Sequence, residues 1–189
     1  MSINILATEE QHELTYRHAI TEIVSKNGWD LKSLSSEAPS LVIFLRHLNC
    51  IYCRESLAEL KRLRTQIEAE GVKIAVVHMG TESQAEDLLS LFGLSNVERF
   101  SDPERRLYRA FGLECTSLGQ LLAPTSWMGM VRAGLKSQFI FGKKLKGMVG
   151  NVLQMPGVFL LSDGNIVGDF KPQRADKRPN YLELAAMKC

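Results

Sequence analysis

The chain has 189 residues, about the length of one domain and enough to bury a core of its own. Apolar residues make up 45% of the sequence, charged residues make up 23%, and the formal net charge is +2. These values are typical of a globular protein and exclude a disordered chain, a collagen-like repeat and the concentrated positive charge that nucleic-acid binding requires.

The first part of the sequence predicts a helix, a loop and a strand. Apolar spacing predicts a helix from Thr8 to Lys26, ended by Asn27-Gly28, which forms an N-terminal extension of about residues 8–27. The polar segment from Ser33 to Ser40 is predicted to be a loop. The continuous apolar run from Leu41 to Leu45 predicts a strand that is buried on both faces of a sheet.

Helices and strands then alternate. An apolar stripe predicts a helix that ends at Gly71, and the next apolar run predicts a strand from Val72 to His78. A helix is predicted from Ser83 to Phe92 and a short strand from Val97 to Phe100. Asp102-Pro103-Glu104 predicts the start of another helix, because proline is favoured in the first helical turn.

The C-terminal part predicts a hairpin and a last helix. Glycines interrupt the pattern after Cys115, where one helix is predicted from Leu118 to Arg132. Two strands, Gly157 to Leu161 and Ile166 to Phe170, flank an Asp-Gly turn, and a short helix begins at Pro179-Asn180. The whole pattern predicts an α/β fold in which helices flank a mixed central sheet, in a single domain over residues 1–189.

Localisation bears on what the four cysteines, Cys50, Cys53, Cys115 and Cys189, can do. The N-terminus lacks the pattern of a secretory signal, and the apolar runs are too short to span a membrane, so we expect a cytoplasmic protein with no membrane or nucleic-acid partner. In that reducing compartment a structural disulfide is disfavoured, and a close cysteine pair indicates metal binding or redox chemistry.

The segment from Arg46 to Glu55 holds the close pair, Cys50-x-x-Cys53, between a predicted strand and a predicted helix. Two cysteines at this spacing on a first helical turn can form a disulfide with little backbone movement. Free N–H groups of that turn and the helix dipole favour a thiolate, as do Arg46 and Arg54 nearby. A thiolate attacks peroxides and disulfides, and the second thiol can then resolve the oxidised product.

Two segments carry a resemblance to a known family: Phe44 to Glu55, with Phe-Leu-Arg-His and Cys-x-x-Cys-Arg-Glu, and Gly157 to Gly164. They resemble the peroxiredoxin-like proteins related to selenoprotein U, within the AhpC/TSA and thioredoxin-like group, over about residues 35–172. The resemblance implies a thioredoxin-like fold with an insertion at about residues 115–155 before the last hairpin. It also implies antioxidant thiol peroxidase or reductase activity.

The resemblance leaves open which sulfur is the nucleophile. By analogy with thioredoxin, Cys50 is the nucleophile and Cys53 resolves, and this is the assignment we favour. In peroxiredoxins the motif is Thr-x-x-Cys, whose reactive cysteine matches Cys53, and here a cysteine replaces the threonine. Thioredoxin-fold proteins also place a cis-proline opposite the pair, which would match Pro156, although an ordinary trans proline fits the sequence equally well.

Other interpretations compete with catalysis by the pair. His47, Cys50, Cys53 and Cys115 could ligate zinc, but the second pair of closely spaced ligands that zinc sites use is missing. His47 is more readily explained as a residue at the end of the strand near the site than as a ligand, and from there it could assist proton transfer. Cys115 and Cys189 are predicted to be inert, with a resolving role as the alternative.

The sequence thus predicts a thiol oxidoreductase that cycles between a Cys50/Cys53 dithiol and disulfide to reduce peroxides or disulfides, with no organic cofactor and no metal. A thiol reductant such as thioredoxin or glutathione would regenerate it. A non-catalytic redox sensor, or a regulatory protein that binds a partner, is the alternative function. A homodimer is compatible with the sequence but does not follow from it.

Overall fold

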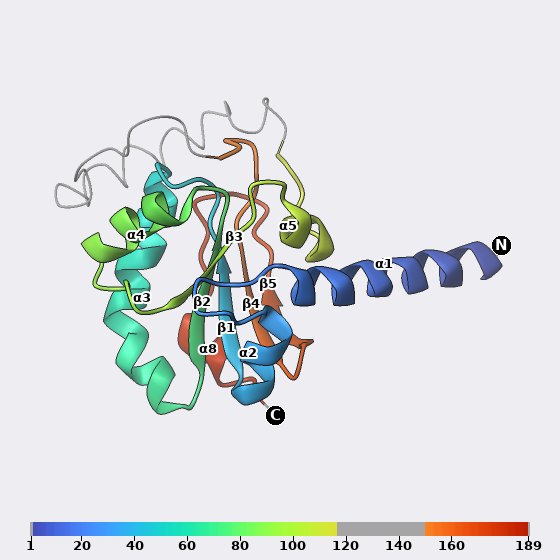
Figure 1. The fold of residues 1–189 in the computed structure, drawn as a ribbon, viewed down its shortest axis with the longest axis horizontal. Helices are drawn as coiled ribbons and strands as arrows, with labels where there is room; N and C mark the ends of the chain where they lie inside the picture. Colours follow the sequence, from blue (N-terminus) through green and yellow to red (C-terminus); the bar gives the residue numbers. More distant parts are fainter. Residues whose placement is uncertain (1, 117–149, 189) are drawn as a thin grey trace.

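The computed structural model describes residues 2–116 and 150–188 and is built around a five-stranded sheet with the strand order β3-β2-β1-β4-β5 (Figure 1). The strands are β1 (Ser40–Phe44), β2 (Lys73–His78), β3 (Glu98–Ser101), β4 (Gly157–Ser162) and β5 (Asn165–Phe170). β1, β2 and β3 are parallel, whereas β4 pairs antiparallel with both β1 and β5. The sheet is therefore mixed, and the predicted hairpin is confirmed.

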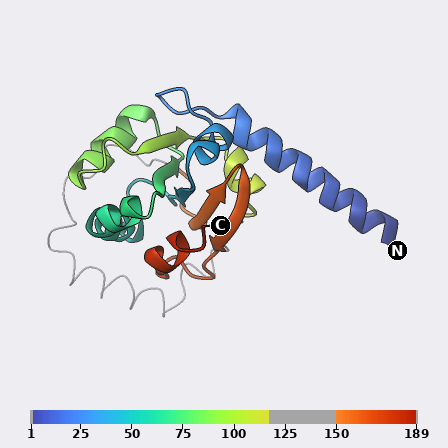
Figure 2. The same ribbon diagram turned by 90° about the horizontal axis from the view of Figure 1, so that it is seen from below.

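Helices cover both faces of the sheet (Figures 1 and 2). Alternate residues of β1 point to opposite faces, so Leu41 and Ile43 belong to one apolar cluster while Val42 and Phe44 belong to the other. The first cluster includes side chains from α3 (Ile51–Ala69), α4 (Glu82–Leu91) and α8 (Tyr181–Ala185). The second includes side chains from α1 (Ser2–Glu22), α2 (Leu31–Glu37) and α5 (Arg106–Ala110). This arrangement confirms the predicted α/β fold.

Helix α2 corrects the prediction of a loop from Ser33 to Ser40. The side chain of Asp30 accepts a hydrogen bond from the backbone N–H of Ser33 at 2.7 Å, and the Ser33 hydroxyl accepts one from the backbone N–H of Asp30, which makes a capping box. Leu31 and Leu34, one helical turn apart, are both buried. The serines gave the segment a polar composition, but capping and two leucines are enough to form a short helix.

Helix α5 begins later than predicted. It starts at Arg106 rather than at Asp102-Pro103-Glu104, because Arg105 adopts a left-handed conformation with φ of 59°. The Asp102 carboxylate still acts as a cap, since it accepts hydrogen bonds from the backbone N–H groups of Arg106 and Leu107, both at 2.8 Å. The sequence therefore predicted this helix but misplaced its first turn.

Helix α1 starts six residues before the predicted Thr8 and ends four residues before the predicted Lys26. It projects from the rest of the molecule (Figures 1 and 2). Its C-terminal part packs on the core through Tyr16, Ala19 and Ile20, and the Tyr16 hydroxyl donates a hydrogen bond to the Gly164 carbonyl at 3.0 Å. The helix predicted from Leu118 to Arg132, and most of the predicted insertion, lie outside the described residues. Within the described ranges, no helix is long and apolar enough to cross a bilayer.

Candidate active site

Both cysteines of the close pair lie where the chain leaves the sheet and enters α3. β1 ends at Phe44, and a short loop leads to Cys50, which is the N-cap residue of α3, with Cys53 in its first turn. The Cys50 side chain makes no capping hydrogen bond. Its sulfur thus lies at the positive end of a 19-residue helix, where a negative charge is stabilised.

The two thiols are free but almost completely covered, with Cys50 4% exposed and Cys53 3% exposed. The Cys53 thiol donates a hydrogen bond to the Cys50 sulfur, and this bond holds the pKa of Cys50 well below its usual range. The same bond, together with burial, raises the pKa of Cys53 well above its usual range. Of the two thiols, Cys50 is therefore the one that ionises more readily.

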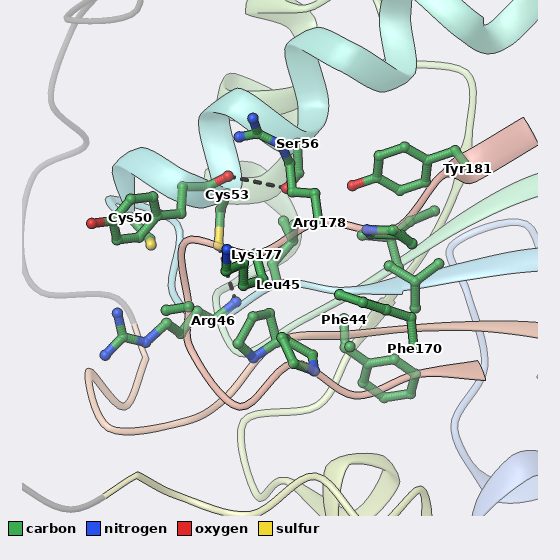
Figure 3. Close-up of a pocket in the computed structure, with 18 residues that line it drawn as sticks. Phe44, Leu45, Arg46, Cys50, Cys53, Ser56, Phe170, Lys177, Arg178 and Tyr181 are labelled. Carbon is green, nitrogen blue, oxygen red and sulfur yellow. Dashed lines mark hydrogen bonds between the residues drawn. The ribbon is translucent and has the colours of Figure 1, made fainter. Parts of the chain in front are cut away.

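His47 and the main chain of Arg46 also contact the pair. A hydrogen bond and the charge of His47 add to the lowering of the Cys50 pKa. The Nδ1 atom of His47 is buried and has no hydrogen-bond partner among the described residues. The Arg46 backbone N–H donates to the Cys53 sulfur at 3.2 Å (Figure 3), which orients that thiol beside Cys50.

The Arg46 side chain binds the opposite wall of the site. Its guanidinium donates from Nε to the Gln154 carbonyl at 3.0 Å and from Nη2 to the Val152 carbonyl. Gln154 is itself buried, and its side-chain amide donates to the Leu113 carbonyl at 2.8 Å. Arg46 thus ties the loop before α3 to the segment that precedes β4, and its predicted role in stabilising the thiolate stays a prediction.

Arg54 and Pro156 were the other predicted supporting residues. Arg54 follows Cys53 in α3 and is buried, and its pKa is lowered by that burial. Pro156 lines the same pocket as the two cysteines. The peptide between Met155 and Pro156 is trans, since the described residues include no cis peptide bond.

A pocket opens beside the pair and extends toward the C-terminal segment (Figure 3). Apolar side chains form most of it, among them Phe44, Val158, Phe170, Pro172 and Pro179. The loop after β5 and the start of α8 add polar groups that the sequence analysis missed: Lys177, Arg178 and Tyr181. Burial raises the pKa of Tyr181 to about 12, so its hydroxyl stays protonated. This loop is irregular and carries no periodic pattern that could have placed it in advance.

Cys115 lies apart from this pocket. It borders a neighbouring pocket that shares Pro156 and Pro172 with the first, and its sulfur lies 3.2 Å from Arg105 Nη1. It is exposed, whereas Cys189 lies outside the described residues. Within the described part of the chain, no three His, Cys, Asp or Glu side chains gather into a group that could hold a metal ion.

Comparison with protein families matches residues 59–171 to the AhpC/TSA antioxidant enzyme model. The chain belongs to the AhpC/TSA antioxidant enzyme family. The matched segment begins after Cys53, so the assignment of this AhpC/TSA chain rests on the scaffold that follows the cysteine pair. The predicted AhpC/TSA resemblance is confirmed, while the relation to selenoprotein U stays a prediction.

Individual relatives of the AhpC/TSA chain carry peroxiredoxin-type names. It is 28% identical over 140 residues to "Peroxiredoxin-like 2C" of Homo sapiens, which covers 70% of this chain and 60% of the relative. It is 27% identical over 143 residues to "Prostamide/prostaglandin F synthase" of Salmo salar, covering 75% and 68%. The chain therefore spans less than two thirds of the length of the human relative.

Solved peroxiredoxin structures share the fold of the AhpC/TSA chain. Peroxiredoxin Q of Xanthomonas campestris superposes with a TM-score of 0.60 at 15% identity, covering 90% of this chain and 92% of that one. Peroxidoxin BcpB of Mycobacterium tuberculosis gives 0.58 at 10% identity, covering 87% and 88%. At this identity the similarity shows the fold alone, and it confirms the predicted thioredoxin-like architecture.

Proposed function

We propose that this chain is a thiol peroxidase in which Cys50 is the nucleophile and Cys53 the resolving thiol. One feature carries the assignment: Cys50 is the N-cap residue of α3, where its hydrogen bond with Cys53 lowers the pKa of Cys50 and helps to raise that of Cys53. A thiolate is the reactive form toward a peroxide. The names of the relatives and the family's description as antioxidant enzymes support the same chemistry.

The reaction consumes one peroxide and two thiols. The Cys50 thiolate attacks one peroxide oxygen and the O–O bond breaks, which gives Cys50 sulfenic acid and an alkoxide that takes up a proton to become an alcohol. The Cys53 thiol then loses its proton, attacks the Cys50 sulfur and releases water, and a Cys50–Cys53 disulfide forms. A dithiol such as reduced thioredoxin, or two molecules of glutathione, supplies the two electrons that restore the thiols.

Surrounding groups support each step. His47, which contacts Cys50, is placed to take the thiol proton and to return it to the leaving oxygen. The N-terminal N–H groups of α3 stabilise the thiolate, and Pro156 shapes the pocket wall that a substrate would meet. Because the resting state needs both thiols reduced, we place the activity in a reducing compartment such as the cytoplasm.

Trapping the sulfenic acid tests the assignment. The Cys53→Ser variant, treated with one equivalent of hydrogen peroxide and then dimedone, is expected to carry the label on Cys50, as located by peptide mass spectrometry. Unlabelled wild-type protein is expected to yield a Cys50–Cys53 disulfide peptide after the same oxidation. The Cys115→Ser variant serves as the control, because Cys115 borders a different pocket.

Two outcomes would contradict the proposal. A Cys50→Ser variant that still forms sulfenic acid on Cys53 at the wild-type rate would reverse the roles and match the Thr-x-x-Cys pattern of peroxiredoxins. A wild-type protein that forms the disulfide once but consumes no further peroxide in the presence of thioredoxin, glutathione or dithiothreitol would be a redox sensor and not an enzyme.

A further inference from the structure

Three cationic side chains line the pocket beside the cysteine pair, and they differ in whether other groups of the protein already bind them. Arg46 donates to two main-chain carbonyls, and Arg178 forms ion pairs with Glu55 at 2.6 Å and Glu59 at 3.1 Å. Lys177 also lines the pocket and is exposed, and no carboxylate partner for its ammonium group is found among the described residues. Its charge is therefore available to a bound molecule.

The acids near Lys177 are paired with other cations. Asp176, the adjacent acid, is engaged by Arg174 at 3.0 Å, and the acids nearest the pocket on α3 are held by Arg178. Figure 3 shows Lys177 at the end of the pocket that holds Cys53 and Arg46, away from Phe170. The pocket thus combines an apolar wall, a free cation and a reactive sulfur.

We propose that Lys177 makes the pocket selective for small substrates that carry a carboxylate, by binding that carboxylate while the reacting atom meets Cys50. The proposal deepens the proposed function and rests on it for the identity of the reaction. A carboxylate approaching the Cys50 thiolate is repelled by its charge, and an ammonium group in the same pocket offsets this repulsion. An uncharged substrate of the same size gains nothing from Lys177, so the residue determines specificity and takes no part in the reaction.

Alkylation by a matched pair of reagents measures this effect without requiring peroxidase activity. Iodoacetate carries a carboxylate and iodoacetamide a neutral amide, and both alkylate a thiolate. Rates at Cys50 are measured by peptide mass spectrometry for wild type and for Lys177→Gln. We expect the ratio of the iodoacetate rate to the iodoacetamide rate to fall about twofold to fivefold in the variant, which is the size of effect expected for an exposed ion pair.

Two control variants and a change of salt concentration separate the effect of charge from those of position and packing. Lys171→Gln removes a lysine at the start of the same loop, which borders the neighbouring pocket and not this one, and should leave the ratio unchanged. Lys177→Glu should lower the ratio further than Lys177→Gln. In the wild type, the ratio of the iodoacetate rate to the iodoacetamide rate should fall as salt is raised from about 0.01 M to about 1 M. Over this range the screening length falls from about 30 Å to about 3 Å.

A pair of peroxides then tests the substrate class. The 4-carboxylate and the 4-carboxamide of cumene hydroperoxide are nearly the same size and differ in charge, and Lys177→Gln should lower kcat/KM about twofold to fivefold for the carboxylate alone. If wild type reduces neither peroxide but the alkylation ratio still depends on Lys177, the proposed function fails and the carboxylate site stands. The selectivity proposal is overturned if Lys177→Gln changes both members of each pair equally, if it changes neither, or if neither alkylating reagent reaches Cys50.

Discussion

The two sides of the pocket come from distant parts of the chain and contribute different properties. On the helix side, His47, Cys50 and Cys53 follow β1 after a short loop, and their contacts lower the pKa of Cys50, the proposed nucleophile. The opposite wall is built by the segment around Pro156 and by the loop after β5, which supply apolar surface and Lys177. Reactivity is therefore local in sequence, whereas access to the sulfur depends on tertiary structure.

This division predicts different consequences of substitution. A change on the helix side should affect every substrate alike, because it alters the thiolate itself. A change on the wall should alter the preference between substrates or the stability of the wall, because the thiolate stays in place. Arg46 connects the two sides, since its backbone contacts Cys53 and its guanidinium binds carbonyls of the opposite segment.

The largest expected effect is that of Cys50→Ser. A serine hydroxyl does not ionise near neutral pH, so hydrogen peroxide consumption with dithiothreitol as reductant should fall by a factor on the order of a thousand or more. Cys115→Ser should stay within about twofold of wild type, since its sulfur borders the other pocket. Residual activity above about a tenth of wild type in Cys50→Ser would show that the helix side is not where peroxide reacts.

Arg46→Met is expected to weaken the connection between the two sides. It leaves the carbonyls of Val152 and Gln154 without the charged donor, which should lower the free energy of unfolding by about 2–3 kcal/mol in urea titrations. Arg62→Met is the control, because the Arg62 side chain is mostly solvent-exposed and its ion pair with Glu59 should contribute less than about 0.5 kcal/mol. Equal losses of unfolding free energy in the two variants would show that the Arg46 guanidinium does not hold the two sides of the pocket together.

His47→Gln should change the pH dependence of the site. Without the imidazole, the Cys50 pKa rises, so the whole pH profile of iodoacetamide alkylation should move to higher pH, and the rate on its acid limb falls about tenfold for each pH unit. His18→Gln is the control, since His18 lies exposed on α1. An unshifted alkylation profile in His47→Gln would remove His47 from the helix side of the site.

The lowered Cys50 pKa also links protonation to folding. The folded thiol ionises at lower pH than the unfolded one, so the thiolate stabilises the folded state above the unfolded pKa, and this contribution is lost as pH falls through the folded pKa. The difference in unfolding free energy between wild type and Cys50→Ser should therefore shrink on acidification. If Cys50 were protonated at every pH tested, the difference in unfolding free energy between wild type and Cys50→Ser would not change with pH.

The helix side could be predicted from the sequence because its signals are short-range. The strand that precedes the pair, the spacing of Cys50 and Cys53, and the helix that follows all lie within one continuous segment. Which of the two thiols has the lower pKa could not be predicted, because this depends on how the Cys53 thiol and His47 face Cys50 after folding.

The opposite wall was only partly predictable. Pro156 was identified because it directly precedes a predicted strand, but Lys177 and Arg178 lie in an irregular loop whose position depends on the packing of the hairpin and α8. Helix α2 was missed for a related reason, since its serine-rich composition resembles a loop and its stability comes from a capping box and buried leucines. Residues whose role depends on tertiary contacts carry no pattern in the sequence.

The smallest functional effect is expected at Tyr108, which lies on α5 in the second apolar cluster and does not line the pocket. Its buried hydroxyl donates to the Leu45 carbonyl at 2.6 Å and lies 3.2 Å from the Val77 carbonyl, where β1 leads into the loop that carries His47. Tyr108→Phe keeps the ring contact with Phe44 and removes only the hydroxyl, so unfolding free energy should fall by about 1–2 kcal/mol.

Alkylation of Cys50 in Tyr108→Phe should stay within about twofold of wild type, because the hydrogen bond between the two sulfurs and the contact with His47 are made by the loop and α3 themselves. A larger loss of reactivity than of stability would show that the ends of β1 and β2 hold the thiolate geometry. In that case the helix side would depend on tertiary support as much as the opposite wall does, and the contrast between local chemistry and long-range access would no longer hold.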